Sequence, residues 1–114
     1  MSCEVRTLQR IAQVIQLRPE AQQAYVECHR QVWPTVLNTI AACHIANYSI
    51  FLRNGVLFAY FEYHGEDYAA DMAKMAADPE TQRWWTMVDP MQAPMNDAEP
   101  GDKWSVLEEV FHTD

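Results

Sequence analysis

Tyr25 and His29 stand four residues apart in a stretch rich in helix formers, and they are the first candidates for chemistry. Side chains at positions i and i+4 project from the same face of a helix, so the phenol and the imidazole can reach one ligand. Histidine has the side-chain pKa nearest neutrality, which suits it to give and take protons. From spacing alone an alternative stays open, because a histidine on a helix is more often structural or simply exposed.

Two further groups of aromatic residues are candidates for binding. Trp84 and Trp85 are neighbours, about 100° apart on a helix, so they cannot both point at the same place. Either both belong to the core, or one lines a pocket edge and offers its flat face to the C–H side of a sugar. Asn47 and Tyr48 open an apolar run, and because strand residues alternate in direction, at most one points inward. An inward tyrosine would hydrogen-bond a small polar ligand, and an edge-exposed tyrosine is the equal alternative.

The cysteines give no metal or nucleophile signal. Cys28-His29 and Cys43-His44 are adjacent pairs, and neighbouring side chains diverge on a helix. Their spacing matches no common zinc pattern and no carboxylate cluster accompanies them, so we expect no metal site. The same divergence argues against a Cys28 nucleophile activated by His29. With Cys3 the cysteines number three and form no CxxC, which predicts reduced thiols and a cytoplasmic protein.

Hydrophobic patterns and helix-start signals predict the elements that position these residues. Pro19, Pro34 and Pro79 each suit the first turn of a helix, and Asn54-Gly55 between two β-branched and aromatic runs predicts a hairpin. The expected order is a strand at 8–17, helices at 19–31 and from 34 to about 41, strands at 46–52 and 56–63, helices at 65–77 and 79–88, a loop at 89–103 and a last strand at 104–112.

This order predicts an α+β fold, a ferredoxin-like antiparallel sheet with helices on one face. The strand at 56–63 is apolar on both faces as far as Phe61, so both sides of the sheet need cover, and helices from one chain cover only one. We expect a second copy on the other face, giving a twofold homodimer that forms a dimeric α+β barrel. With 114 residues, the whole chain 1–114 is expected to be one domain.

Composition excludes several classes of function. Eight Lys and Arg against sixteen Asp and Glu give a net charge of −8, which is unfavourable for contact with phosphate backbones, so we expect no nucleic-acid partner. No apolar run approaches the roughly 18 residues of a membrane span and the N-terminus lacks a signal-peptide core, so no membrane partner is expected. The chain has three glycines and carries no GxGxxG, P-loop or GxSxG motif.

A set of short motifs resembles the L-rhamnose mutarotase family over about residues 10–111. The motifs are Tyr25-x-x-x-His29, Val32-Trp33-Pro34, Asn47-Tyr48-Ser49-Ile50, Gln82-Arg83-Trp84-Trp85 and Glu109-Val110-Phe111. The resemblance implies a dimeric α+β barrel that interconverts the α and β anomers of a 6-deoxyhexose, L-rhamnose above all, without metal or organic cofactor. By the same resemblance His29 matches the proton donor, Tyr25 and Tyr48 the sugar-binding tyrosines, and Trp84 with Trp85 the substrate-contacting tryptophans.

Two departures from the family pattern bear on the choice of sugar. Thr35 follows Trp-Pro where the family often has an acidic residue, and the proline-rich loop at 89–103 is individual. Related L-fucose mutarotases share the fold and motifs, so L-fucose is the first alternative substrate. A cofactor-free oxygenase or haem-degrading dimeric α+β barrel is a second alternative, and a non-enzymatic small-ligand or interaction module is a third. The base that acts on the anomeric hydroxyl is a tyrosine, a water or the same histidine.

Overall fold

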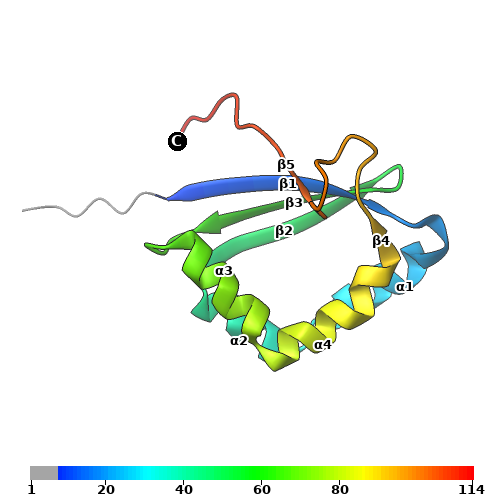
Figure 1. The fold of residues 1–114 in the computed structure, drawn as a ribbon, viewed down its shortest axis with the longest axis horizontal. Helices are drawn as coiled ribbons and strands as arrows, with labels where there is room; N and C mark the ends of the chain where they lie inside the picture. The colour runs from blue at the N-terminus through cyan, green and yellow to red at the C-terminus, as the bar shows by residue number, and fades with distance from the viewer. Residues whose placement is uncertain (1–7) are drawn as a thin grey trace, which may run out of the picture.

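The computed structural model describes residues 8–114, in which helices pack against one face of an antiparallel sheet (Figure 1). The elements are β1 (Gln9–Leu17), α1 (Gln22–Cys28), α2 (Pro34–Ala42), β2 (Ile45–Arg53), β3 (Val56–Tyr63), α3 (Tyr68–Ala77), α4 (Pro79–Val88), β4 (Gln92–Ala93) and β5 (Ser105–Val106). The sheet order is β2-β3-β1-β4, and β5 also pairs with β1. The predicted ferredoxin-like α+β fold with helices on one face is therefore confirmed.

The core lies between the sheet and the helices. In the register of β1 and β3, Ile15 faces Leu57 and Ile11 faces Phe61, so these side chains share the face that points toward the helices. Ile15 is completely buried and Leu57 is 1% exposed. They pack in one cluster with buried residues of the helices, namely Tyr25, Val36, Trp84 and Val88. We call this helix-covered side of the sheet the inner face.

Helix boundaries differ from the sequence prediction where proline and capping residues act. The helix expected at 19–31 is an α-helix only in α1, with 3₁₀ turns at Pro19–Ala21 and His29–Gln31 on either side. It ends there because a residue before proline is held extended, and Trp33 has φ −58° and ψ 133°. Similarly, α3 begins at Tyr68 because the Asp67 side chain caps it by accepting a hydrogen bond from the Ala70 amide.

The β2–β3 hairpin forms where predicted, and an irregularity in β2 changes which side chains point inward. Asn54 and Gly55 both have positive φ, 52° and 72°, as a type I′ turn requires. Earlier in β2, the register shifts between Ala46 and Ser49, and Asn47 has φ 50°. Two residues, Asn47 and Tyr48, therefore oppose one residue of β3, which is a β-bulge.

The strand expected at 104–112 is largely wrong. Only Ser105–Val106 pairs with β1, followed by one hydrogen bond from the Leu107 amide to the Ala12 carbonyl at 2.8 Å. Beyond it the chain leaves the sheet (Figure 1), held by an ion pair of 2.9 Å between Arg10 and Glu109. Strand formation depends on packing against neighbouring side chains. Within one chain no surface covers the apolar side chains that suggested a strand, so the strand does not extend further. Phe111 is accordingly 78% exposed.

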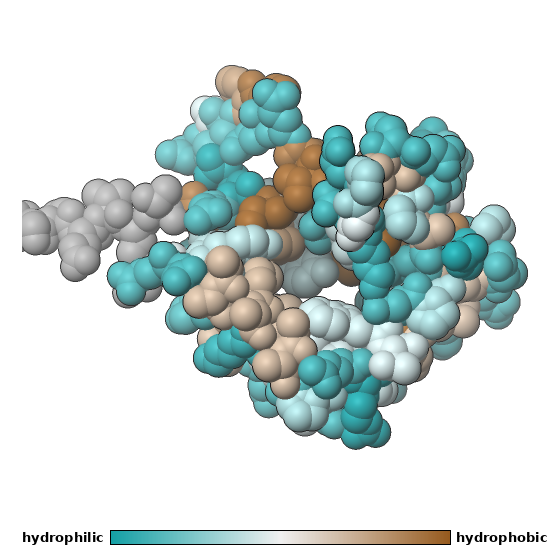
Figure 2. All heavy atoms as spheres, in the orientation of Figure 1, coloured by the Kyte–Doolittle hydropathy of each residue, from teal (hydrophilic) through white to brown (hydrophobic). Residues whose placement is uncertain are grey.

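The face of the sheet opposite the helices, the outer face, carries exposed apolar side chains. Phe51 on β2 and Phe58 on β3 are direct partners in the register and are 63% and 41% exposed. Figure 2 shows hydrophobic residues gathered on this side, between the sheet and the C-terminal tail. Within residues 8–114 none of the helices has the length and apolar character needed to cross a membrane.

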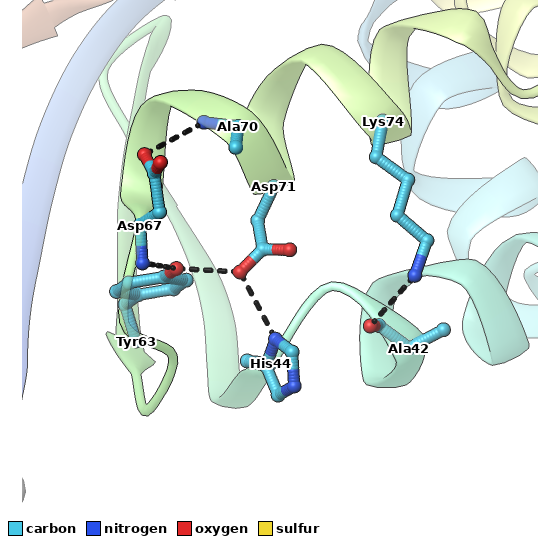
Figure 3. A network of polar contacts seen from close by, with 7 residues as sticks. All are labelled: Ala42, His44, Tyr63, Asp67, Ala70, Asp71 and Lys74. Carbon is cyan, nitrogen blue, oxygen red and sulfur yellow. Dashed lines mark hydrogen bonds and ion pairs between the residues drawn. The ribbon is translucent and has the colours of Figure 1, made fainter.

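A polar network fixes α3 to the end of the sheet (Figure 3). The fully buried Tyr63 donates its hydroxyl hydrogen to Asp71 Oδ2 at 2.5 Å, and the same hydroxyl accepts the Asp67 amide at 3.0 Å. His44 Nδ1 lies 3.0 Å from the same Asp71 oxygen. Gly65 is required here, because a Cβ would lie against the phenol and 2.7 Å from Asp71 Oδ2. The hydrogen bonds from Tyr63 and His44 lower the pKa of Asp71 below its ordinary value.

Replacing Asp71 by asparagine is expected to lower the melting temperature at pH 7 by roughly 5 °C, because the ionised acceptor is lost. The pKa of Asp71 is lowered in the folded protein, so the carboxylate stabilises the fold above its ordinary pKa of 3.8 and this contribution disappears as pH falls through the folded value. The difference in melting temperature between wild type and Asp71→Asn should therefore become smaller below about pH 4. Thermal unfolding followed by circular dichroism across pH measures it, with Asp97→Asn, an exposed turn residue, as the control. A difference in melting temperature that does not change with pH would contradict the conclusion that the ionised Asp71 carboxylate stabilises the fold.

Candidate functional site

Tyr25 and His29 lie together at the C-terminal end of α1, on the inner face. Their rings stack with centroids 4.1 Å apart and planes inclined by 28°. His29 Nδ1 is 2.8 Å from the backbone carbonyl oxygen of Tyr25. A carbonyl oxygen only accepts, so Nδ1 carries the proton and donates it. The Nε2 atom of the neutral ring is therefore the nitrogen left to exchange a proton with a ligand.

Tryptophans form the other wall around His29. Trp84 is 6% exposed, and its ring meets that of His29 edge to face at 5.2 Å and that of Trp33 at the same distance. Trp85 is half-buried and packs against the same core cluster, but it is more exposed than Trp84. Burial lowers the pKa of His29 below 6.5, and the hydrogen bond to the Tyr25 carbonyl only partly opposes it. His29 is consequently neutral at pH 7.

The β-bulge in β2 turns Tyr48 toward the same inner space. Its ring lies 5.4 Å from that of Phe61, which is buried on the inner face, whereas the Asn47 amide donates to Glu62 on the outer face at 2.7 Å. Of these two neighbours only Tyr48 points inward, which agrees with the expectation that at most one of them does so. Burial, and secondly the nearby Tyr48 phenol, raise the pKa of Tyr25. Tyr48 is 41% exposed, and partial desolvation of its phenol raises its pKa as well, so both phenols keep their protons and can donate hydrogen bonds.

Gln92 belongs to this site and was missed from the sequence. It lies in the stretch expected to be a loop, but β4 pairs it with Leu17 and so places its side chain on the inner face. It is 8% exposed, and its Nε2 donates to the Tyr25 hydroxyl oxygen at 3.4 Å. The only sequence signal was a three-residue run between Pro90 and Pro94, too short for periodicity to reveal a strand.

A second glutamine interrupts the apolar inner face. Gln13 lies on β1 between Ile11 and Ile15, opposite Ala59, and therefore points toward the helices. Within residues 8–114 the structure records no hydrogen bond of its amide to another protein group. Strand alternation was a signal that could have identified this residue. The floor of the site is therefore polar at one position.

The expectation that adjacent side chains diverge is wrong for Cys28 and His29. Cys28 Sγ lies 3.3 Å from His29 Nδ1 and 3.2 Å from the Tyr25 carbonyl oxygen, because both side chains turn back onto that carbonyl where α1 ends. Burial raises the pKa of Cys28, so its thiol stays protonated and is not an activated nucleophile. In the described part of the chain, no three His, Cys, Asp or Glu residues are grouped to hold a metal ion. Cys3 lies outside the described residues.

Thr35, the departure from the family pattern, contacts an acidic residue from another helix. Its Oγ1 donates to Glu80 Oε1 on α4 at 3.1 Å. The other Glu80 oxygen pairs with Arg83 at 2.7 Å, and the Arg83 guanidinium lies 5.7 Å from the centre of the Trp33 ring. A carboxylate at position 35 would face Glu80 at short range and be repelled. Glu80 thus supplies a negative charge beside Trp-Pro that the sequence lacks at position 35.

A separate groove of about 470 Å³ lies on the outer face, below the C-terminal tail, and its lining includes Arg10, Tyr60, Glu62 and Glu109. The sheet separates it from His29. We place the candidate site on the inner face instead, because an imidazole with a lowered pKa, two phenols and an amide converge there within aromatic walls. Figure 2 shows the surface hollowed between the sheet and the helices α3 and α4.

Comparison with known proteins identifies the family to which the chain belongs. A sequence model described as L-rhamnose mutarotase matches residues 10–113. An L-rhamnose mutarotase of Listeria monocytogenes is 35% identical over 92% of this chain and 98% of the relative, and an L-fucose mutarotase of Xanthomonas campestris is 32% identical over 92% and 88%. The crystal structure of an L-rhamnose mutarotase from Formosa agariphila superposes with a TM-score of 0.71 and 28% identity, over 93% of this chain and 99% of that one. The chain therefore belongs to the L-rhamnose mutarotase family.

Proposed function

We propose that the protein interconverts the α and β anomers of a 6-deoxyhexose, with L-rhamnose as the main substrate and L-fucose as the alternative, and that His29 transfers the proton. The observation that carries this proposal is the orientation of His29, whose Nδ1 donates to the Tyr25 carbonyl, while among residues 8–114 no hydrogen bond to its Nε2 is recorded. The family match favours a mutarotase over a haem-degrading barrel or a non-enzymatic module.

The neutral resting state of His29 suggests how one residue serves both directions. Nε2 takes the proton from the anomeric hydroxyl, and the electrons of that O–H bond form the C1=O double bond. The bond between C1 and the ring oxygen breaks, and the imidazolium gives its proton to that oxygen. The open aldehyde turns about its C1–C2 bond, and the reverse steps close the ring as the other anomer. His29 thus acts as the donor with a proton that the sugar itself supplies.

The remaining site residues would hold the sugar. Tyr25 and Tyr48 keep their protons because burial raises the pKa of each, and they suit donation to sugar oxygens. Trp84 and Trp85 supply flat apolar surface for the C–H face and the 6-methyl group. General acid–base catalysis by one group supplies about 10²–10⁴-fold, and mutarotation also proceeds slowly in water, so this set of residues is sufficient.

We also propose that two copies form a homodimer through the outer face. The exposed side chains of Phe51 and Phe58 support it, and so does Phe111 in the C-terminal tail, which is 78% exposed. A contiguous exposed apolar surface of this kind marks an interaction site, and identical copies associate most often in twofold dimers. The free thiols of Cys28 and Cys43 support a reducing, cytoplasmic location.

Replacing His29 by asparagine is expected to reduce the rate of anomer exchange by about 10²-fold or more, because the proton-transfer group is lost. Saturation-transfer NMR on L-rhamnose, L-fucose and D-glucose measures the exchange directly and identifies the preferred sugar. His64→Asn, a change at an exposed histidine, is the matched control and should keep the wild-type rate. Undiminished exchange in His29→Asn would remove His29 from the mechanism, and a preference for D-glucose would exclude a 6-deoxyhexose substrate.

The pH profile should show a loss of activity on the acid side. Burial lowers the pKa of His29 below 6.5, and only the neutral ring can accept the anomeric proton. We expect kcat/KM to be constant from pH 7 to 8 and to fall as pH falls through that lowered pKa. Exchange rates of wild type, corrected with the His29→Asn variant for acid catalysis by the buffer, give the profile. Activity that rises on acidification would instead make the imidazolium the starting form.

Replacing Phe51 by aspartate should convert a dimer to a monomer, since it places a charge within the exposed apolar surface. Size-exclusion chromatography with light scattering should give twice the chain mass for wild type and the single-chain mass for Phe51→Asp. Leu37→Asp is the control, because Leu37 is an exposed apolar residue on α2, on the helix side of the sheet. A monomeric wild type, or dissociation by both changes, would refute the outer-face interface.

A further inference from the structure

Gln92 is buried although the fold alone does not require its amide. Thr81, at 2% exposed, and Gln92, at 8%, are the buried polar residues of the described chain. Thr81 has a structural role, because its hydroxyl donates to Asp78 at the start of α4. Gln92 instead directs its amide at the Tyr25 phenol, inside the candidate site. Burying a polar side chain costs free energy unless it is hydrogen-bonded. The burial of the Gln92 amide beside Tyr25 therefore suggests a function for it.

The direction of the hydrogen bond defines what Tyr25 can still do. Gln92 Nε2 only donates, so the Tyr25 oxygen accepts, and the Tyr25 hydrogen must point to another acceptor. Within residues 8–114 no protein acceptor for that hydrogen is recorded, nor a donor to the carboxamide oxygen of Gln92. A free donor and a free acceptor therefore lie side by side. A sugar hydroxyl, which accepts one hydrogen bond and donates another, matches this pair.

The backbone that carries Gln92 is held on both sides. The Arg18 amide donates to the Met91 carbonyl at 2.8 Å, and the Gln16 side-chain amide donates to the Pro94 carbonyl at 2.7 Å. The two-residue strand β4 lies between these contacts and pairs with the end of β1. The amide is thus presented from a fixed backbone position, as a group that selects a ligand must be.

We propose that Gln92 is a specificity-determining residue that holds Tyr25 as a hydrogen-bond donor and, together with it, binds one ring hydroxyl of the sugar. This inference rests on the proposed function and adds a residue of the proline-rich segment to its site. A site built around a hydroxyl rejects an analogue that lacks it, because the buried donor and acceptor are then left unpaired. The protein should therefore discriminate strongly against one monodeoxy derivative of L-rhamnose.

The test compares Gln92→Met and Gln92→Glu with Tyr25→Phe. Methionine keeps the length of the side chain and removes the amide, and we expect KM for L-rhamnose to rise roughly tenfold with a smaller change in kcat. Glutamate keeps a hydrogen bond to Tyr25 but reverses it, because a carboxylate accepts the phenol hydrogen, so Gln92→Glu should not restore KM. Combined with Tyr25→Phe, Gln92→Met should raise KM by less than the product of the two single effects. Gln16→Leu is the control, because it removes one side-chain contact of this segment while the Arg18–Met91 hydrogen bond and the pairing of β4 with β1 still hold Gln92, so KM should stay unchanged.

The outcomes separate the inference from the proposed function. Three results would each overturn the inference, because a purely structural role of Gln92 predicts them. They are a wild-type KM in Gln92→Glu, a rise of KM in Gln16→Leu as large as in Gln92→Met, and independent effects of Gln92→Met and Tyr25→Phe on KM. The ¹³Cζ NMR shift of Tyr25 should change in Gln92→Met and not in Gln16→Leu. Wild type that exchanges no sugar would defeat the mutarotase proposal. The hydroxyl-binding inference then stands only if L-rhamnose still alters tryptophan fluorescence in wild type and fails to do so in Gln92→Met.

Discussion

The hydrogen bond between His29 Nδ1 and the Tyr25 carbonyl is the contact on which the site depends. A helix leaves its last carbonyls without backbone partners, and α1 ends where the Tyr25 carbonyl accepts the His29 backbone amide and the ring nitrogen together. The contact of the ring nitrogen therefore fixes the imidazole orientation and decides which nitrogen can meet a ligand. It is made within five residues of chain, so a local contact orients the imidazole that we propose as the proton-transfer group.

Distant segments then set the electrostatic surroundings of that histidine. Trp84 from α4 covers one side of the ring and Tyr25 the other, and the desolvation they cause holds His29 neutral. The same burial keeps the Tyr25 phenol protonated. Burial disfavours the charged form of both side chains. It therefore lowers the pKa of His29 and raises the pKa of Tyr25, which keeps the imidazole neutral and the phenol protonated. The result is one proton acceptor beside one hydrogen-bond donor, a suitable pair for a neutral sugar.

The sequence predicted best what is determined locally. The shared face of Tyr25 and His29 follows from helical spacing, and the turn at Asn54-Gly55 follows from residue types that tolerate positive φ. Gln92 was missed because its strand is two residues long and exists only through pairing with β1. The strand at 104–112 was predicted too long. Alternation of apolar residues shows which side chains a segment could bury, but it does not show whether the fold provides a surface that covers them. Tyr48 points inward because a β-bulge shifts the register of β2 by one residue, and no pattern in the sequence predicted this bulge.

The position of the site relative to the sheet separates catalysis from assembly. Every group in the candidate site projects from the inner face or from the helices above it, whereas the exposed phenylalanines lie on the outer face. A cavity between two sheets, as expected from a barrel-like dimer, would therefore lie across the sheet from His29. Contact with a second copy would stabilise the sheet without supplying a reacting group. In the mechanism that we propose, a single chain supplies every group that transfers a proton, and a small domain is sufficient because that reaction moves one proton between two oxygens bonded to the same carbon.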